Sequence, residues 1–168
     1  MDKSTRCFGN KDSVMAEYND TEWGVPLHDD RELFGLILLE GAQAGLSWRT
    51  VLHRREAYRE AFAGFDPEVV ATFTSERLED IRLNSGVIRN KLKIASAVKN
   101  AKGFLEIQRE FGSFDKYLWA YVEHKPVMNG FDSWKEVPAE TELSTRISKD
   151  LKKRGLSFVG PTIMYAYM

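Results

Sequence analysis

The sequence predicts an all-α fold. Apolar residues recur at helical spacing along most of the 168 residues, and no segment alternates polar and apolar residues for long enough to predict a strand. A chain of this length can bury about two-thirds of the surface that its unfolded form exposes. We therefore expect a single helical domain, residues 1–168, built as two small lobes that share a core.

Seven helices are expected in order along residues 1–154. The first long one has Asp29 or Asp30 as its N-cap, and the second long one is interrupted by Gly103. The last ends where three cations precede Gly155, a common helix stop. The polar segment 124–140 is expected to be a loop. The expected helices span residues 30–48, 49–61, 67–72, 75–83, 87–103, 114–122 and 141–154.

Composition excludes several classes of protein. With 43% hydrophobic and 29% charged residues, the chain is neither fibrous nor disordered. No stretch approaches the ~20 apolar residues of a membrane span, and no apolar signal core follows the N-terminus, so we expect a cytoplasmic protein that does not bind membranes. The single cysteine, Cys7, excludes an internal disulfide and an all-cysteine metal site.

The net charge of −1 hides an asymmetry between the two halves. Residues 1–80 hold nine Lys and Arg against 16 Asp and Glu, a net −7, whereas residues 81–168 hold 15 against nine, a net +6. One stretch of the second half carries Arg89, Lys91 and Lys93 without an acid. Such a distribution can orient an acidic ligand toward one side of the protein, although ordinary solvated helix faces would have the same composition.

Glu40 is a carboxylate on an apolar helix face. It shares a stripe with Leu33, Ile37 and Ala44, so we expect it to be at least partly buried. A buried carboxylate needs a partner or a shifted pKa. Glu40 therefore either pairs with an arginine or caps a neighbouring helix, or it serves in a pocket as a hydrogen-bond acceptor or general base.

Aromatic residues cluster in sequence around this helix. Tyr18, Trp23 and Trp48 flank it, and Gly41 and Gly45 permit close approach of a backbone or a ligand. Aromatic faces with one carboxylate suit a flat, cationic ligand, because the rings stack on it and the acid binds its edge. Tryptophans that only fill a core are the alternative.

The turn from Gly155 to Thr162 joins two helical patterns. Such a glycine-containing turn can expose backbone N–H groups to a phosphate oxygen, and Lys152 and Lys153 add positive charge beside it. Most glycine–helix joints bind nothing, so the pattern alone does not decide between a DNA contact and a plain connection.

Together these features resemble the monofunctional 3-methyladenine DNA glycosylase I family of bacteria. The resemblance covers nearly the whole chain and includes a specific Glu-x5-Leu-Ser-Trp core. It implies a helix-hairpin-helix glycosylase fold with a base-binding cleft between the lobes and the hairpin at about 143–168. The motifs that carry it are Glu22–Pro26, Leu39–Trp48, Gly86–Asn90, Leu151–Gly155 and Phe158–Thr162.

The resemblance implies an enzyme that removes 3-methyladenine from alkylated duplex DNA and leaves an abasic site. Glu40 matches the carboxylate that recognises the base and acts in catalysis, Tyr18 and Trp48 match stacking walls, and Trp23 shapes the pocket. Gly45 and Leu46 match the residues inserted where the base has left. The expected partners are alkylated double-stranded DNA and the free base, and the protein is expected to be a monomer. The residues expected to contact the DNA backbone are Lys91, Lys153, Gly155, Gly160 and Thr162.

The sequence departs from the family pattern at its metal site. The family holds a zinc ion with two cysteines and two histidines, but here only Cys7 matches, Asn19 stands at the second position, and the chain stops at Met168 before the later pair. We therefore expect no metal and no other cofactor. Met15 replaces a further pocket aromatic. A protein of the same fold that binds damaged or abasic DNA without cutting it is the alternative function.

Overall fold

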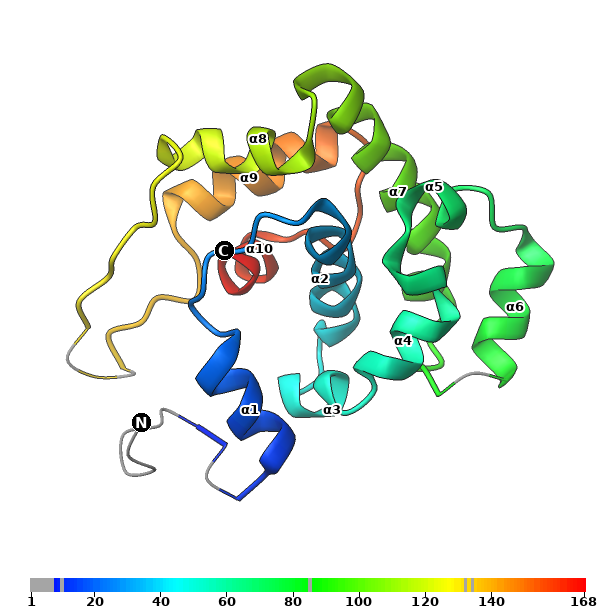
Figure 1. Ribbon diagram of the computed structural model, residues 1–168, viewed down its shortest axis with the longest axis horizontal. Helices are drawn as coiled ribbons and strands as arrows, with labels where there is room; N and C mark the ends of the chain where they lie inside the picture. Colours follow the sequence, from blue (N-terminus) through cyan, green and yellow to red (C-terminus); the bar gives the residue numbers. More distant parts are fainter. Residues whose placement is uncertain (1–7, 10, 85, 132, 134) are drawn as a thin grey trace.

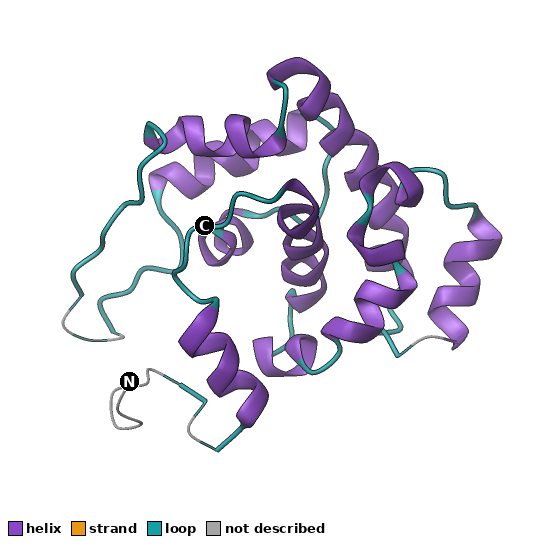
Figure 2. Ribbon diagram, viewed as in Figure 1, coloured by secondary structure: helices purple, strands orange, loops and turns teal. Residues whose placement is uncertain are grey.

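The computed structural model is entirely helical over the residues that it describes, which are 8–9, 11–84, 86–131, 133 and 135–168. No strand occurs among them (Figure 2), and none of their helices is both long and apolar enough to cross a bilayer. The expected all-α class is confirmed. The helices are α1 Ser13–Thr21, α2 Asp30–Gln43, α3 Trp48–Leu52, α4 Arg55–Ala61, α5 Pro67–Val70, α6 Ser75–Asn84, α7 Lys91–Phe111, α8 Phe114–Trp119, α9 Glu142–Lys153 and α10 Pro161–Tyr167, with 3-10 turns η2 Ala63–Phe65 and η3 Ala120–Val122.

Helix α2 lies at the centre of the molecule. Helices α4 to α7 gather on one side of it and α8 to α10 on the other, and α1 and α3 lie near its C-terminal end (Figure 1). It packs against α3, α7, α8 and α10, which is why Leu33, Phe34, Ile37 and Leu38 are all buried. Burying one such side chain contributes about 1.5–3 kcal/mol. The helix that bears Glu40 is thus held from several sides.

The helix expected over 30–48 ends earlier, at Gln43. Its N-cap is Asp29, whose carboxylate accepts the Glu32 N–H at 2.9 Å. At the other end Ala44 leaves the helical path with φ −44° and ψ 112°, and Gly45 follows it in a left-handed conformation with φ +79°. Ser47 then caps a new helix, so Trp48 begins α3 instead of ending α2. The apolar stripe of the sequence therefore continues across a turn.

Gly103 does not interrupt a helix, contrary to the expectation. Helix α7 begins at Lys91, after the Asn90 cap, and runs through Gly103 to Phe111. A Cβ on Gly103 would lie 2.5 Å from Leu156 Cδ1 and 2.9 Å from the Arg154 carbonyl oxygen. The glycine is needed for close packing, because it lets the α9–α10 turn lie directly on α7.

The α9–α10 hairpin is closed by backbone and side-chain bonds. The Leu156 N–H donates to the Leu151 carbonyl at 3.0 Å, and Gly155, at φ +90°, ends α9 as the sequence predicts. Buried Asn100 of α7 accepts the Ser157 N–H at 2.8 Å and donates to the Ser157 carbonyl at 3.0 Å. These paired bonds fix the turn to α7.

Candidate active site

Glu40 lies in the last turn of α2 with only 3% of its surface exposed. Its Oε2 has no hydrogen-bond partner, and no ion pair reaches Glu40 from the described residues. Burial raises the pKa of the carboxyl to about 8. The only other buried side-chain polar atom without a partner in the described chain is Nε1 of Trp48. An arginine-paired Glu40 is therefore not what the structure shows.

Tyr18 and Trp48 lie together, and Tyr18 is near enough to Glu40 to be affected by its charge. Their ring centroids are 5.4 Å apart at an interplanar angle of 54°. Burial, together with the charge of nearby Glu40, raises the pKa of the Tyr18 hydroxyl to about 12. Because the two rings already touch, an incoming base must stack on a free ring face or move the rings apart. Of the residues expected to bind the base, Tyr18 is therefore the one that contacts Trp48 and lies near Glu40.

Phe8 extends this aromatic group and was not anticipated from the sequence. Its ring stacks on Tyr18 at 6.2 Å and meets Trp23 edge-on at 5.2 Å. Trp23 itself is 42% exposed, so it lies at the outer end of the group. The only sequence signal for it is an aromatic residue directly after Cys7, outside the aromatic cluster predicted around the helix that carries Glu40.

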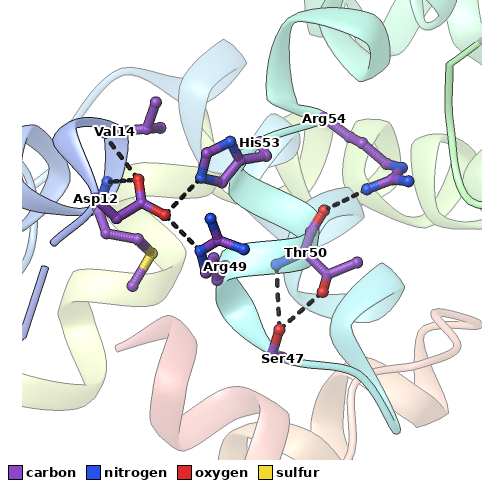
Figure 3. A network of polar contacts seen from close by, with 8 residues as sticks. Asp12, Val14, Ser47, Arg49, Thr50, His53 and Arg54 are labelled. Carbon is purple, nitrogen blue, oxygen red and sulfur yellow. Dashed lines mark hydrogen bonds and ion pairs between the residues drawn. The ribbon is translucent and has the colours of Figure 1, made fainter.

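Asp12 joins the helices that carry Tyr18 and Trp48 (Figure 3). One carboxylate oxygen accepts the N–H groups of Val14 and Met15 at the start of α1, while the other bonds Arg49 and His53 near α3. The His53 bond is the largest cause that lowers the pKa of Asp12 to about 2, with the Met15 and Arg49 bonds adding to it. One carboxylate thus ties the start of α1 to α3 and its C-cap.

The turn between α2 and α3 is exposed and carries an apolar side chain. Gly45 and Ser47 are exposed, Leu46 is 41% exposed, and the Leu46 N–H donates to the Gln43 carbonyl. A Cβ on Gly45 would contact nothing, so its left-handed conformation, not crowding, is what favours glycine there. This is the geometry expected of a segment that inserts into DNA, and its role stays a prediction.

The residues expected to contact the DNA backbone fall in two places. Lys153, Gly155, Gly160 and Thr162 lie on the α9–α10 hairpin, whereas Lys91 begins α7 and its charge acts on Glu79 of α6. Lys152 and Lys153 are exposed. Arg154, by contrast, forms ion pairs with Glu110 and Asp150, so its charge is already matched within the protein.

The described residues do not fit the zinc ion of the related family. Asn19 offers a neutral amide, a poor ligand for Zn²⁺, and Cys7 lies outside the described residues. No three His, Cys, Asp or Glu side chains gather in the part of the chain that the structure describes. That this protein holds no metal stays a prediction.

Comparisons with known proteins agree with this geometry. A family model described as methyladenine glycosylase matches residues 8–168. The DNA-3-methyladenine glycosylase of Haemophilus influenzae is 45% identical over 98% of this chain and 90% of its own length, and DNA-3-methyladenine glycosylase 1 of Escherichia coli is 42% identical over 97% and 88%.

Solved structures show the same similarity. A crystal structure of 3-methyladenine DNA glycosylase I is 42% identical, with a TM-score of 0.93 over 97% of this chain and 90% of that one. A structure addressing 3-methyladenine recognition by the Staphylococcus aureus enzyme is 38% identical, with a TM-score of 0.91 over 94% and 84%. The chain belongs to the methyladenine glycosylase family.

Proposed function

We propose that this protein excises 3-methyladenine from alkylated duplex DNA and that Glu40 recognises the base after it has left the helix. The observation that carries the assignment to Glu40 is its buried Oε2, which has no hydrogen-bond partner in the described part of the chain. Leaving such a group unsatisfied costs free energy in the empty protein, which a ligand with a matching donor or positive charge would recover.

The duplex must be opened before this site can act. A stacked base cannot reach Glu40, so the nucleotide rotates out of the DNA duplex. Residues of the protein then fill the gap that the base leaves in the duplex. The exposed Gly45–Leu46 turn, two and three residues beyond the end of α2 at Gln43, is the segment that we assign to this gap. The hairpin and Lys91 contact phosphates, which supports binding without sequence preference.

The protonation state of Glu40 suits a cationic base. With a pKa of about 8, the carboxyl of the empty protein holds its proton at neutral pH. A base methylated at N3 is positively charged and favours the ionised carboxylate, so binding releases the proton. As the N-glycosidic bond breaks, its electron pair neutralises the purine, and water adds its hydroxyl to the sugar carbon while its remaining proton passes to solvent. The carboxylate also stabilises the positive charge that develops there.

Release of free 3-methyladenine from methylated duplex DNA tests this function. We expect release by the wild-type protein, and a loss of at least about 100-fold in single-turnover rate for Glu40→Gln. Exposed Glu60 of α4 provides the matched control, because Glu60→Gln makes the same chemical change away from the site. Tight binding of an abasic-site duplex with no base released by the wild type would instead establish the non-catalytic alternative.

The same variants separate two roles for Glu40. If Glu40 acts by recognition, Glu40→Gln lowers affinity for the free base and for the damaged duplex. If it activates water, turnover falls while the affinity is retained. We assign recognition and charge stabilisation to Glu40, since the cationic leaving group needs little proton transfer.

A further inference from the structure

Lys93 points into the protein instead of toward solvent. It belongs to the cationic stretch at the start of α7, yet its ammonium donates to the backbone carbonyls of Ala42 at 2.8 Å and Ala44 at 2.5 Å. Its side chain is partly buried, and this burial lowers the pKa of the ammonium. Two of its three donors are therefore used on the end of α2.

The end of α2 needs such a donor. The last carbonyls of a helix have no partner within it, and they form the negative end of the helix dipole. The last turn of α2 contains no basic residue, and Ala44, with φ −44° and ψ 112°, has already left the helix. Lys93 supplies from another helix the cation and the donors that this end lacks.

We propose that Lys93 is a positioning residue that holds the Gly45–Leu46 turn in the conformation that enters DNA. The inference rests on the proposed function, because it assigns a purpose to the geometry of that turn. The two carbonyls that Lys93 binds lie on either side of Gln43, whose own carbonyl accepts the Leu46 N–H. Lys93 thus fixes the three-residue segment from which the turn departs, and it acts through protein atoms, not through a phosphate.

Lys91 provides a contrast on the same helix turn. It is exposed, and no hydrogen bond to the described backbone holds its ammonium. Replacing Lys91 by methionine removes one positive charge from the surface, whereas replacing Lys93 by methionine removes two bonds at the end of α2. Both changes preserve most of the side-chain length and have the same effect on net charge.

The test compares Lys93→Met, Lys93→Arg and Lys91→Met on methylated duplex DNA. The salt dependence of DNA affinity counts phosphate contacts, since each contact contributes about one to the slope of log K against log salt. We expect Lys93→Met to keep the wild-type slope and Lys91→Met to lower it by about one. We also expect Lys93→Met to slow single-turnover excision by about 10- to 100-fold, because misplacement of a functional segment has effects of that size.

Two further readouts keep a folding defect apart from a positioning defect. Lys93→Met should bind free 3-methyladenine with wild-type affinity, since Glu40 remains in place, and Lys93→Arg should recover most of the excision rate because its guanidinium can reach the same carbonyls. A 2-aminopurine next to an abasic site should show weaker fluorescence change with Lys93→Met, reporting incomplete insertion of the turn.

The outcomes are distinct. If wild-type protein releases no base, the proposed function fails. If it does, a Lys93→Met slope reduced by about one makes Lys93 a phosphate contact, and unchanged excision shows that it positions nothing. Loss of free-base affinity in both Lys93 variants would also overturn the inference, since it would place the defect at Glu40.

Discussion

Two acids near opposite ends of helix α2, Asp30 and Glu40, have opposite surroundings. Asp30 in the first turn accepts three hydrogen bonds, from Gln108 Nε2 and from the Phe114 and Asp115 N–H groups, all at 2.6–2.8 Å. Glu40 in the last turn is more deeply buried, yet its Oε2 has no hydrogen-bond partner among the described residues. The first carboxylate ties α2 to α7 and α8.

The difference separates a structural acid from a binding acid. Hydrogen-bond acceptors that serve the fold find their donors within it. An isolated buried carboxyl lowers the stability of the protein, so it is retained only where function needs it. We therefore expect the same isosteric change from acid to amide to have opposite effects on stability at Glu40 and at Asp30.

The largest expected effect is on the pH dependence of stability. Burial raises the pKa of Glu40 to about 8 in the folded protein, against 4.5 for an ordinary glutamate. Between these values the native state binds more protons than the unfolded state, so Glu40 makes the free energy of unfolding fall as pH rises from about 5 to 8. The loss, of the order of 3–5 kcal/mol, is absent in Glu40→Gln.

Urea unfolding of the wild type and Glu40→Gln from pH 5 to 9 measures this effect. Titration of all other groups is common to the two proteins, so their difference isolates Glu40. We expect the stability advantage of Glu40→Gln to grow with pH and level off above about 8. A difference that is constant across this range would mean that Glu40 does not hold a proton in the folded state.

A smaller effect of the opposite sign is expected at the other end of α2. In Asp30→Asn an amide NH₂ replaces an oxygen that faces N–H donors, so the free energy of unfolding should fall by about 2–3 kcal/mol. Excision by the folded protein should stay within a few-fold of wild type, because Asp30 lies a helix length from the site. A large loss of excision with unchanged stability would abolish the distinction between the two acids.

Local signals in the sequence predicted much of the fold. Asp29 is an N-cap, and the cations before Gly155 end α9, because both features depend on residues within one turn. The end of α2 was misplaced because the apolar stripe continues past Gly45 to Trp48. The prediction that Gly103 interrupts a helix was wrong. A glycine is needed there because of close contact with Leu156, which is more than 50 residues away in sequence.

The candidate site was predictable in part. Periodicity placed Glu40 on a buried face, but only the fold shows that no other described residue forms a hydrogen bond with its Oε2. In the sequence Lys93 is one of several cations at the start of a helix. Its two carbonyl partners, Ala42 and Ala44, lie in and just after α2, about 50 residues earlier, so the sequence does not reveal them. The same is true of Asp12, whose bonds to Arg49 and His53 join distant segments. Long-range pairing has no signature in local sequence.

Tryptophan fluorescence titrated with free 3-methyladenine tests most directly whether the unpartnered acid selects the base. Trp48 lies at the site, so the account predicts quenching by 3-methyladenine, little or none by adenine, and loss of the 3-methyladenine response in Glu40→Gln. Equal quenching by both bases, or an undiminished response in Glu40→Gln, would contradict it.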